Sequence, residues 1–220
     1  MKRKIMLIGF IIPFITEAQI KSFNSYPIYN GNELGLSYTP LQSTFRIWAP
    51  TAEKAELIFY KEGIGGTALQ TISMQKSGSG TWIALLKGDQ KGKFYTFRIR
   101  TNKKWLNEVP DPYAKAVGVN GKRAMVIDLT DTNPAGWQND KSPVLKNATD
   151  AVIYELHIRD ASIAGNSGIS NKGKFIGLTE KGTTNNDGLP TGLDHLKELG
   201  VTHIHLLPFY DFLSVDDTNP

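Results

Sequence analysis

The sequence predicts two kinds of β structure in one chain: an antiparallel β-sandwich, followed by a strand–helix–strand unit with a parallel pair of strands. The sandwich is expected because short apolar runs alternate with glycine-rich turns between residues 43 and 129. The second part is expected because two apolar runs, 151–158 and 201–209, flank a segment with leucines at helical spacing. A chain of 220 residues, 40% hydrophobic and 21% charged, is long enough for two such folded parts.

Six apolar runs are expected to form the strands of the sandwich, each ending at a turn or a polar stretch. In chain order they are STFRIWAP (43–50), KAELIFY (54–60), ALQTISM (68–74), TWIALL (81–86), KFYTFRIR (93–100) and RAMVIDL (123–129). In the fifth run, Tyr95, Phe97 and Ile99 occupy every second position, and polar residues stand between them. This alternation predicts one face in the core and one face in water.

The composition and the hydrophobic pattern of the sequence change after the sandwich. Residues 130–150 contain two prolines and several Asn and Asp residues, which indicates a connector. Residues 151–158 are expected to form a buried strand, and a polar, glycine-rich loop follows over 161–190. The segment 191–200 is expected to be a helix that ends at its final glycine, and 201–209 contains the second strand.

Residues 1–18 have the layout of a secretory signal peptide: a basic start, an apolar run and a small residue, Ala18, at the end. The apolar run is too short to span a bilayer. The alternative, a buried N-terminal helix, conflicts with Pro13 and with the basic start. We therefore expect export to the periplasm, the cell surface or the extracellular medium. The chain has no cysteine, which excludes disulfides, thiolate metal sites and a cysteine nucleophile.

The net positive charge of the chain does not indicate a nucleic-acid partner. The formal net charge is +4 and the pI about 9.1, but the leader contributes three basic residues and one acidic residue. Its removal leaves a charge of about +2, which is ordinary for a domain of this size. We expect neither a nucleic-acid partner nor a membrane span.

Five stretches of the chain carry a resemblance to a known family. They are FRIWAPTAEKAELIFY (45–60), EVPDPYAKAV (108–117), AVIYELHIRDAS (151–162), SGISNKGKFIGLTEKGT (167–183) and TGLDHLKELGVTHIHLLPFYDFLSVDD (191–217). With these stretches in the same order as in that family, the chain resembles the type I pullulanases from about Tyr29 to Pro220. These are α-glucan debranching enzymes of glycoside hydrolase family 13. The stretch 173–183 is the most discriminating, because branching enzymes and isoamylases usually lack it.

The resemblance implies a domain plan and an activity. Residues 19–129 resemble a family 48 carbohydrate-binding module with an immunoglobulin-like fold. Residues 130–150 would be the connector, and residues 151–220 would be the start of a (β/α)₈ barrel. A complete barrel needs roughly 250 residues, so we expect this one to be truncated after its first two strands. The implied activity is hydrolysis of α-1,6-glucosidic branches in pullulan, starch or glycogen, without a cofactor. The family's catalytic carboxylates come from later strands and match no position here, so the chain alone is expected to be inactive.

Five residues are candidates for binding the α-glucan. Trp48, Trp82 and Trp105 are candidates because aromatic faces stack on the apolar faces of sugar rings. Alternation places Trp48 on the outer face of its strand, where it is expected to face solvent or pack against the following domain. Arg159 and Asp211 stand at or just past strand ends, where barrel enzymes place groups that contact substrate.

Two other functions remain open. A non-catalytic α-glucan-binding or interaction module is the first alternative. The second is a metal hydrolase that uses His203 and His205, which share one face of a strand. We expect these histidines to be buried and structural, and we expect no metal. Glu155 and His157 also share a face, and we expect them to be hydrogen-bonded in a barrel floor rather than to act as an acid–base pair.

Overall fold

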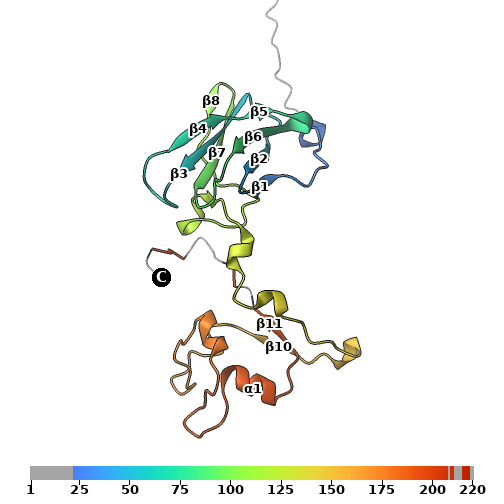
Figure 1. Ribbon diagram of the computed structural model, residues 1–220, viewed down its shortest axis with the longest axis vertical. Coiled ribbons are helices and arrows are strands. Elements are labelled where there is room, and N and C mark those ends of the chain that lie inside the picture. The colour runs from blue at the N-terminus through green and yellow to red at the C-terminus, as the bar shows by residue number, and fades with distance from the viewer. Residues whose placement is uncertain (1–21, 208, 211–214, 219–220) are drawn as a thin grey trace, which may run out of the picture. The chain divides into compact units, whose positions relative to one another are not determined.

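The computed structural model describes residues 22–207, 209–210 and 215–218 (Figure 1). The predicted signal peptide, residues 1–18, lies outside the described residues. The chain divides after Asp131 into two compact units, which we describe separately.

The first unit contains two antiparallel sheets (Figure 1). The first sheet has the order β1 (Gly35–Thr39), β2 (Gln42–Trp48), β6 (Thr81–Lys87) and β5 (Gln75–Lys76). The second has the order β4 (Gln70–Ser73), β3 (Lys54–Tyr60), β7 (Phe94–Thr101) and β8 (Lys104–Trp105), with β9 (Ala124–Met125) also paired to β7. Short 3-10 helices connect them: η1 (Phe23–Ser25), η2 (Gly78–Gly80), η3 (Val119–Gly121) and η4 (Leu129–Thr132). The predicted β-sandwich is confirmed.

Aromatic rings from both sheets form the centre of the sandwich. Phe45 of β2 is fully buried and meets the rings of Phe59 and Tyr95 edge to face, with centroids 5.5 and 4.9 Å apart. Phe97, two residues along β7, packs against Tyr95 at 5.7 Å. The alternation predicted for residues 93–100 therefore places its apolar residues in the core.

Four strands of the sandwich differ from the prediction. The two-residue strands β5 and β8 were not predicted. β1 (Gly35–Thr39) was not predicted, because its five residues include only two apolar side chains that pack on the core, Leu36 and Tyr38. The run 123–129 was predicted as a full strand, but only Ala124 and Met125 are in β9. After Met125 the backbone continues to bond to the end of β7, with Val126 N–H donating to Lys93 O at 2.9 Å.

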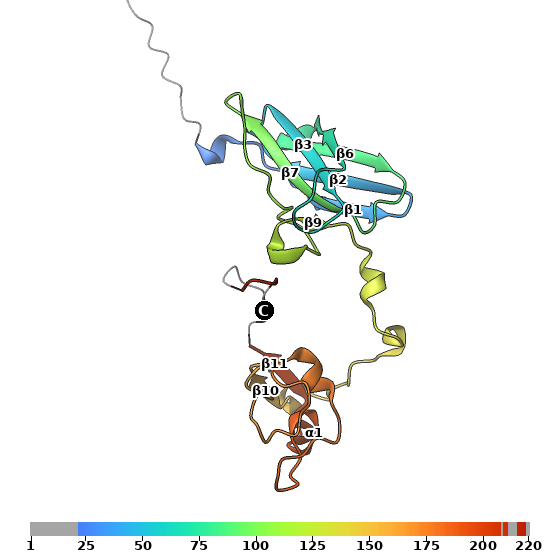
Figure 2. The ribbon, with the colours of Figure 1, turned by 90° about the vertical axis from the view of Figure 1, so that its left-hand side faces the viewer.

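The described residues of the second unit form one parallel pair of strands, one α-helix and three short 3-10 helices. These are η5 (Trp137–Asn139), η6 (Ala148–Asp150), β10 (Ile153–Leu156), η7 (Phe175–Thr179), α1 (Gly192–Glu198) and β11 (His203–Leu206). Figure 2 shows β10, β11 and α1 in a second view. The predicted helix and the predicted parallel pair are both present. Among the described residues, no helix is long and apolar enough to cross a membrane.

The expectation that residues 151–158 form a fully buried strand is wrong for this structure. Leu156 and Ile158 are buried against Leu196 of helix α1, but Ile153 is 67% exposed. One helix can cover only one face of a two-stranded sheet, so the other face of β10 is in contact with solvent.

Candidate functional site

The three candidate tryptophans of the sandwich lie in different environments. Trp82 is only 6% exposed, and its indole N–H donates to the carbonyl of Ala49 at 3.1 Å. Its ring faces are therefore in the core and are not available to a sugar. This corrects the expectation that Trp82 binds substrate, and leaves Trp48 and Trp105 as candidates.

Trp105 lies on an exposed hairpin at the edge of the five-stranded sheet. The two-residue turn between β7 and β8 consists of Asn102 and Lys103, both at positive φ, which is the geometry of the favoured tight hairpin turns. This turn pairs Trp105 with Arg100. The Trp105 side chain is 38% exposed, so part of its ring is available to solvent.

A charged neighbour holds Trp105 in place. The guanidinium of Arg98 lies 4.9 Å from the Trp105 ring centroid, and Arg98 Nε donates to the Glu56 carboxylate at 2.6 Å. Arg98 and Glu56 are partners across β7 and β3 and project from the outer face of the sheet. The guanidinium thus stacks on the indole while Glu56 balances its charge. The pair presents an ordered aromatic surface with hydrogen-bonding groups beside it.

Trp48 ends β2 and is half-buried. Its indole N–H donates to the carbonyl of Pro27 at 3.0 Å, and the ring of Phe23 meets it edge-on at 6.1 Å. The segment before β1 therefore covers part of the outward face on which Trp48 was predicted to lie. The ring also lines a hollow of about 640 Å³, together with Leu106 and Tyr113.

A buried carboxyl anchors the segment that follows Trp105. Asp111 accepts hydrogen bonds from the Tyr95 hydroxyl and the Tyr113 backbone N–H, both at 2.8 Å. Burial raises the pKa of the Asp111 carboxyl, although these two hydrogen bonds oppose the rise. Burial also raises the pKa of the Tyr95 hydroxyl. The chain at residues 105–113 is thereby fixed against β7, which positions Tyr113.

The buried carboxyl of Asp111 is expected to make the stability of the sandwich depend on pH. Because its folded-state pKa is raised above 3.8, the folded state holds this proton more tightly than the unfolded state does. The stabilisation of the folded sandwich by the protonated Asp111 carboxyl is fully present at pH values below the pKa of the unfolded state. It is lost as the pH rises through the pKa of the folded state. In that window the free energy of unfolding, relative to Asp111→Asn, should fall by up to about 1.4 kcal/mol per pH unit. A difference between the two proteins that stays constant with pH would contradict this.

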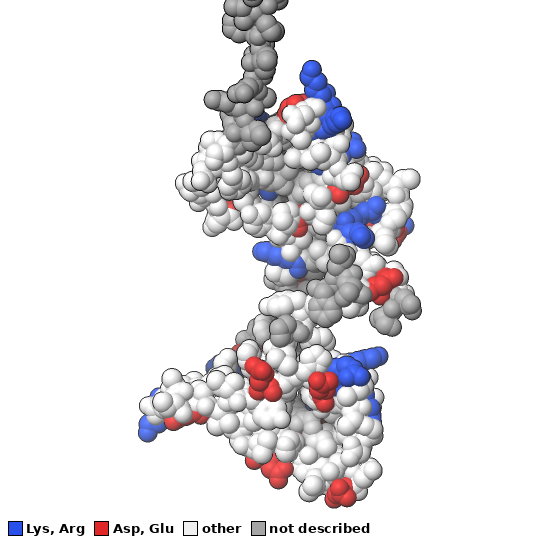
Figure 3. Space-filling view, turned by 180° about the vertical axis from the view of Figure 1, so that it is seen from behind, with Lys and Arg blue, Asp and Glu red and all other residues white. Residues whose placement is uncertain are grey.

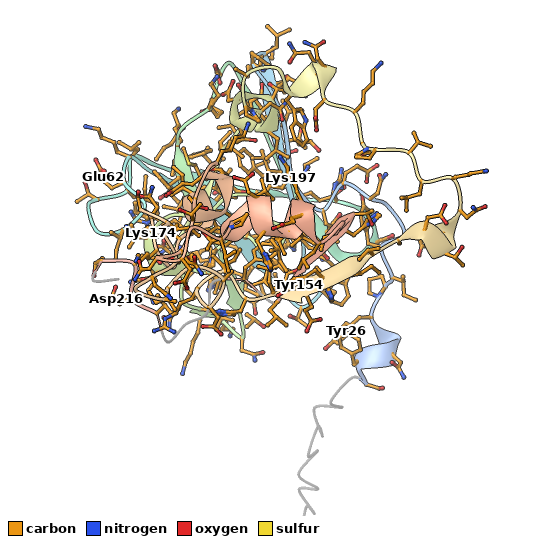
Figure 4. The ribbon with its side chains drawn as sticks, turned by 90° about the horizontal axis from the view of Figure 1, so that it is seen from below. Tyr26, Glu62, Tyr154, Lys174, Lys197 and Asp216 are labelled. Atoms are coloured by element: carbon orange, nitrogen blue, oxygen red, sulfur yellow. The ribbon has the colours of Figure 1, made fainter. Side chains whose placement is uncertain are left out.

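Of the two candidate residues of the second unit, only Arg159 lies among the described residues. Figure 4 shows Tyr154 on strand β10 and Lys197 on helix α1. Arg159 is exposed, and its guanidinium lies 3.4 Å from the carboxylate of its neighbour Asp160. Asp211 lies outside the described residues. The structure therefore tests the surroundings of Arg159 alone, which is free to contact a ligand.

The histidines of the second unit do not lie as predicted. Glu155 pairs across the two strands with His205, whose Nδ1 is 3.0 Å from the carboxylate, rather than with His157. The parallel register puts Glu155 directly opposite His205, which accounts for this pairing. His203 and His205 are exposed and not buried as expected, because the described residues leave this face of β11 open, whereas Leu206 packs on the cluster that contains Leu196. In the described part of the chain, no three His, Asp or Glu side chains are placed to hold a metal ion.

The long loop after β10 is held together by its own polar groups. The Glu180 carboxylate accepts hydrogen bonds from the backbone N–H groups of Ser170 and Asn171, each at 2.8 Å, and these bonds lower its pKa. The Lys172 ammonium donates to the carbonyl of Gly165 at 2.7 Å. The loop is thus an ordered structure, although the sequence indicated only a polar, glycine-rich stretch.

Arg98 and Tyr113 were not predicted as site residues. A usable indication existed for Arg98: it lies on the outward face of β7, and a two-residue turn returns the chain beside it at Trp105. Tyr113 could not be found in this way, because its position depends on the contact of Asp111 with Tyr95, which are 16 residues apart.

Comparisons with known proteins identify the class of the sandwich first. Residues 33–114 match the family described as Carbohydrate-binding module 48 (Isoamylase N-terminal domain). This segment contains both Trp105 and Arg98 and ends just after Tyr113.

Comparisons over the whole chain then identify particular relatives. The chain is 40% identical over 192 residues to a pullulanase of Bacillus subtilis, covering 87% of this chain and 26% of that protein. The crystal structure of the apo pullulanase from Paenibacillus barengoltzii superimposes with a TM-score of 0.82 at 49% identity, covering 90% of this chain and 30% of that one. The pullulanase from the same organism has also been solved with maltohexaose and α-cyclodextrin, with a TM-score of 0.83. The predicted resemblance to the pullulanases is confirmed, and the chain spans about a quarter to a third of the length of these relatives.

Proposed function

We propose that this chain is part of an exported, pullulanase-type debranching enzyme, and that its sandwich binds the α-glucan substrate at Trp105. The observation that carries the binding proposal is the exposed Trp105 ring, which Arg98 holds at 4.9 Å within the segment that matches carbohydrate-binding module 48. Solved relatives include a pullulanase in complex with maltohexaose and α-cyclodextrin, which supports an α-glucan as the ligand class.

The chemistry at Trp105 suits a neutral sugar. The apolar face of a glucosyl ring stacks on the exposed part of an indole, while nearby polar groups accept or donate hydrogen bonds at the ring edge. On the face of the sandwich shown in Figure 3, side chains of both charge signs are present, so this face does not have a field of a single sign.

For the second unit, we propose the start of a (β/α)₈ barrel. The parallel pair β10 and β11 with helix α1 is the repeating unit of such a barrel, and the exposed side chains of β10 are those that further strands and helices would cover. Arg159 would then lie at the carboxyl edge of the strands, where barrel enzymes bind substrate.

The proposed activity of the whole protein is hydrolysis of α-1,6-glucosidic branches. Retaining hydrolysis needs a nucleophilic carboxylate and a carboxylic acid about 5 Å apart, on opposite sides of the glycosidic bond. No residue of this chain matches the family positions that supply these groups. We therefore expect residues 19–220 to release no reducing ends from pullulan at any pH. Turnover that persists after host glucosidases have been removed would contradict this expectation.

The second candidate function is a glucan-binding module without catalysis. The exposed Trp105 ring supports this module as strongly as it supports the enzyme, because glucan binding at Trp105 requires no residue of the barrel. Transcript sequencing through the 3′ end of the reading frame separates the two: family carboxylate motifs after residue 220 support the enzyme, and a stop codon there supports the module.

Replacing Trp105 is expected to weaken glucan binding. We expect the full chain to bind maltohexaose with a Kd of about 1 mM, equivalent to about −4 kcal/mol. Trp105→Ala removes the stacking surface and should raise the Kd at least about fivefold, equivalent to about 1 kcal/mol. Isothermal titration calorimetry measures the change. Trp137→Ala, which removes an exposed tryptophan of the second unit, is the matched control and should leave the Kd unchanged. If both variants bind as the wild type does, Trp105 is not the binding surface.

A further inference from the structure

A second aromatic surface of the sandwich lies where the segment before β1 crosses the end of β2. Its cleft has a volume of about 470 Å³ and is lined by five aromatic side chains. These are Phe23, Tyr26, Tyr29, Trp48 and Tyr113. The adjoining hollow of about 640 Å³ shares Trp48 and Tyr113 with it. Both volumes are in the range of natural ligand sites. Trp105 lines neither of them, although Arg98, whose guanidinium stacks on the Trp105 ring, lines the larger hollow.

Hydrogen bonds and ring contacts fix the walls of this cleft. Because the Trp48 indole N–H is used by Pro27 O, what Trp48 presents to a ligand is its ring and not its polar edge. Phe23 meets Trp48 and Tyr26 edge-on, at 6.1 and 6.4 Å. Tyr113, which also lines the cleft, is held through its backbone N–H by Asp111 and remains 53% exposed.

The lining of the cleft determines the chemistry of its ligand. Of the described residues that line it, none carries a formal charge. Charged groups adjoin the cleft at Tyr29, whose ring lies 5.5 Å from the Arg46 guanidinium and whose hydroxyl donates to the Glu33 carboxylate, so these two opposite charges lie together. Asn24 supplies an amide, and the tyrosines supply hydroxyl groups beside ring faces. Aromatic faces with neutral hydrogen-bonding edges match an uncharged sugar, whose rings are apolar above and below and polar around the edge.

We propose that this aromatic cleft is a second α-glucan site on the sandwich, separate from Trp105. The choice of glucan as ligand rests on the function proposed above. Because the adjoining hollow continues the cleft past Trp48 and Tyr113, it takes an oligosaccharide rather than a single glucose. Residues 22–34 form one wall, so the segment before β1 is part of the binding site and not merely a connection to it.

Nuclear magnetic resonance on the full chain tests the site directly, with maltohexaose as the probe. The indole N–H resonance of Trp48 should move on titration. That of Trp82, which is buried and bonded to Ala49 O, should not move. Affinity should rise from glucose to maltohexaose, because the longer sugar reaches both hollows. It should not change between low and high salt, because a neutral sugar carries no charge for the salt to screen.

Variants separate the two sites. In a Trp105→Ala background, Tyr26→Ala and Tyr113→Ala should each weaken the remaining maltohexaose binding at least about fivefold, whereas Trp137→Ala should leave it unchanged. Tyr113 lies beside the buried Asp111, so Tyr26→Ala and Phe23→Ala provide the decisive result if Tyr113→Ala does not fold. The inference is overturned if Trp105→Ala alone abolishes binding, or if the Trp48 resonance stays still while glucan binds. If the wild type binds no glucan at all, the glucan-binding function proposed above fails with it.

Discussion

Replacing Phe45 by alanine is expected to lower the free energy of unfolding of the sandwich by about 3–5 kcal/mol. Phe45 is fully buried, and its ring meets Phe59 and Tyr95 of the other sheet. Alanine would remove both edge-to-face contacts and leave a cavity between the sheets. Domains of this size are stable by only about 5–15 kcal/mol, so the loss is a large fraction of the total.

The measurement is urea unfolding of the full chain, followed by the indole resonance of Trp82, which reports on the sandwich alone. Leu85→Ala is the matched control, because Leu85 lies on the outer face of the neighbouring strand β6 and is exposed. That change should alter the free energy of unfolding by less than about 0.5 kcal/mol. Equal effects of the two substitutions would show that Phe45 is not at the centre of the core.

The sandwich could be predicted from sequence wherever apolar residues occur on one face of a strand only. In β7 the alternation of Tyr95 and Phe97 with polar residues identified the buried face correctly. In β6 the run Trp82 to Leu86 is apolar at every position, so the pattern did not show which face is buried. Trp82 was a candidate for sugar binding by its residue type alone, and it is instead part of the core.

The candidate sites depend on contacts between distant segments, which periodicity does not report. Trp48 was predicted to face outward, but its partial burial comes from Phe23 and Pro27, more than 20 residues earlier in the chain. In the same way, the pairing of Glu155 with His205 follows from the register of β10 with β11. The spacing of Glu155 and His157 within one strand could not indicate that register.

The two units are expected to differ strongly in stability. Amide groups of β3 and β7 should be protected from hydrogen exchange at least about a hundredfold more than those of β10 and β11, equivalent to about 3 kcal/mol. β3 and β7 pair over seven residues around a closed core. β10 and β11 pair over four residues, and three of the four side chains in each strand are exposed. Two-stranded sheets are marginal in water, and parallel sheets need cover on both faces.

The exposed face of β10 is also expected to cause self-association. Ile153 is 67% exposed beside unpaired strand edges, which makes this region a template for pairing between chains. Ile153→Lys should lower the apparent mass in analytical ultracentrifugation and leave the Trp82 indole resonance unchanged, because a charge on an exposed strand opposes such pairing.

Limited proteolysis should cut the wild type within residues 130–150 and 161–190 and leave the sandwich intact. If β10 and β11 are as strongly protected as β7 in a chain that is monomeric, the parallel pair is stable without further strands, and the proposal that a larger barrel covers it loses its physical basis.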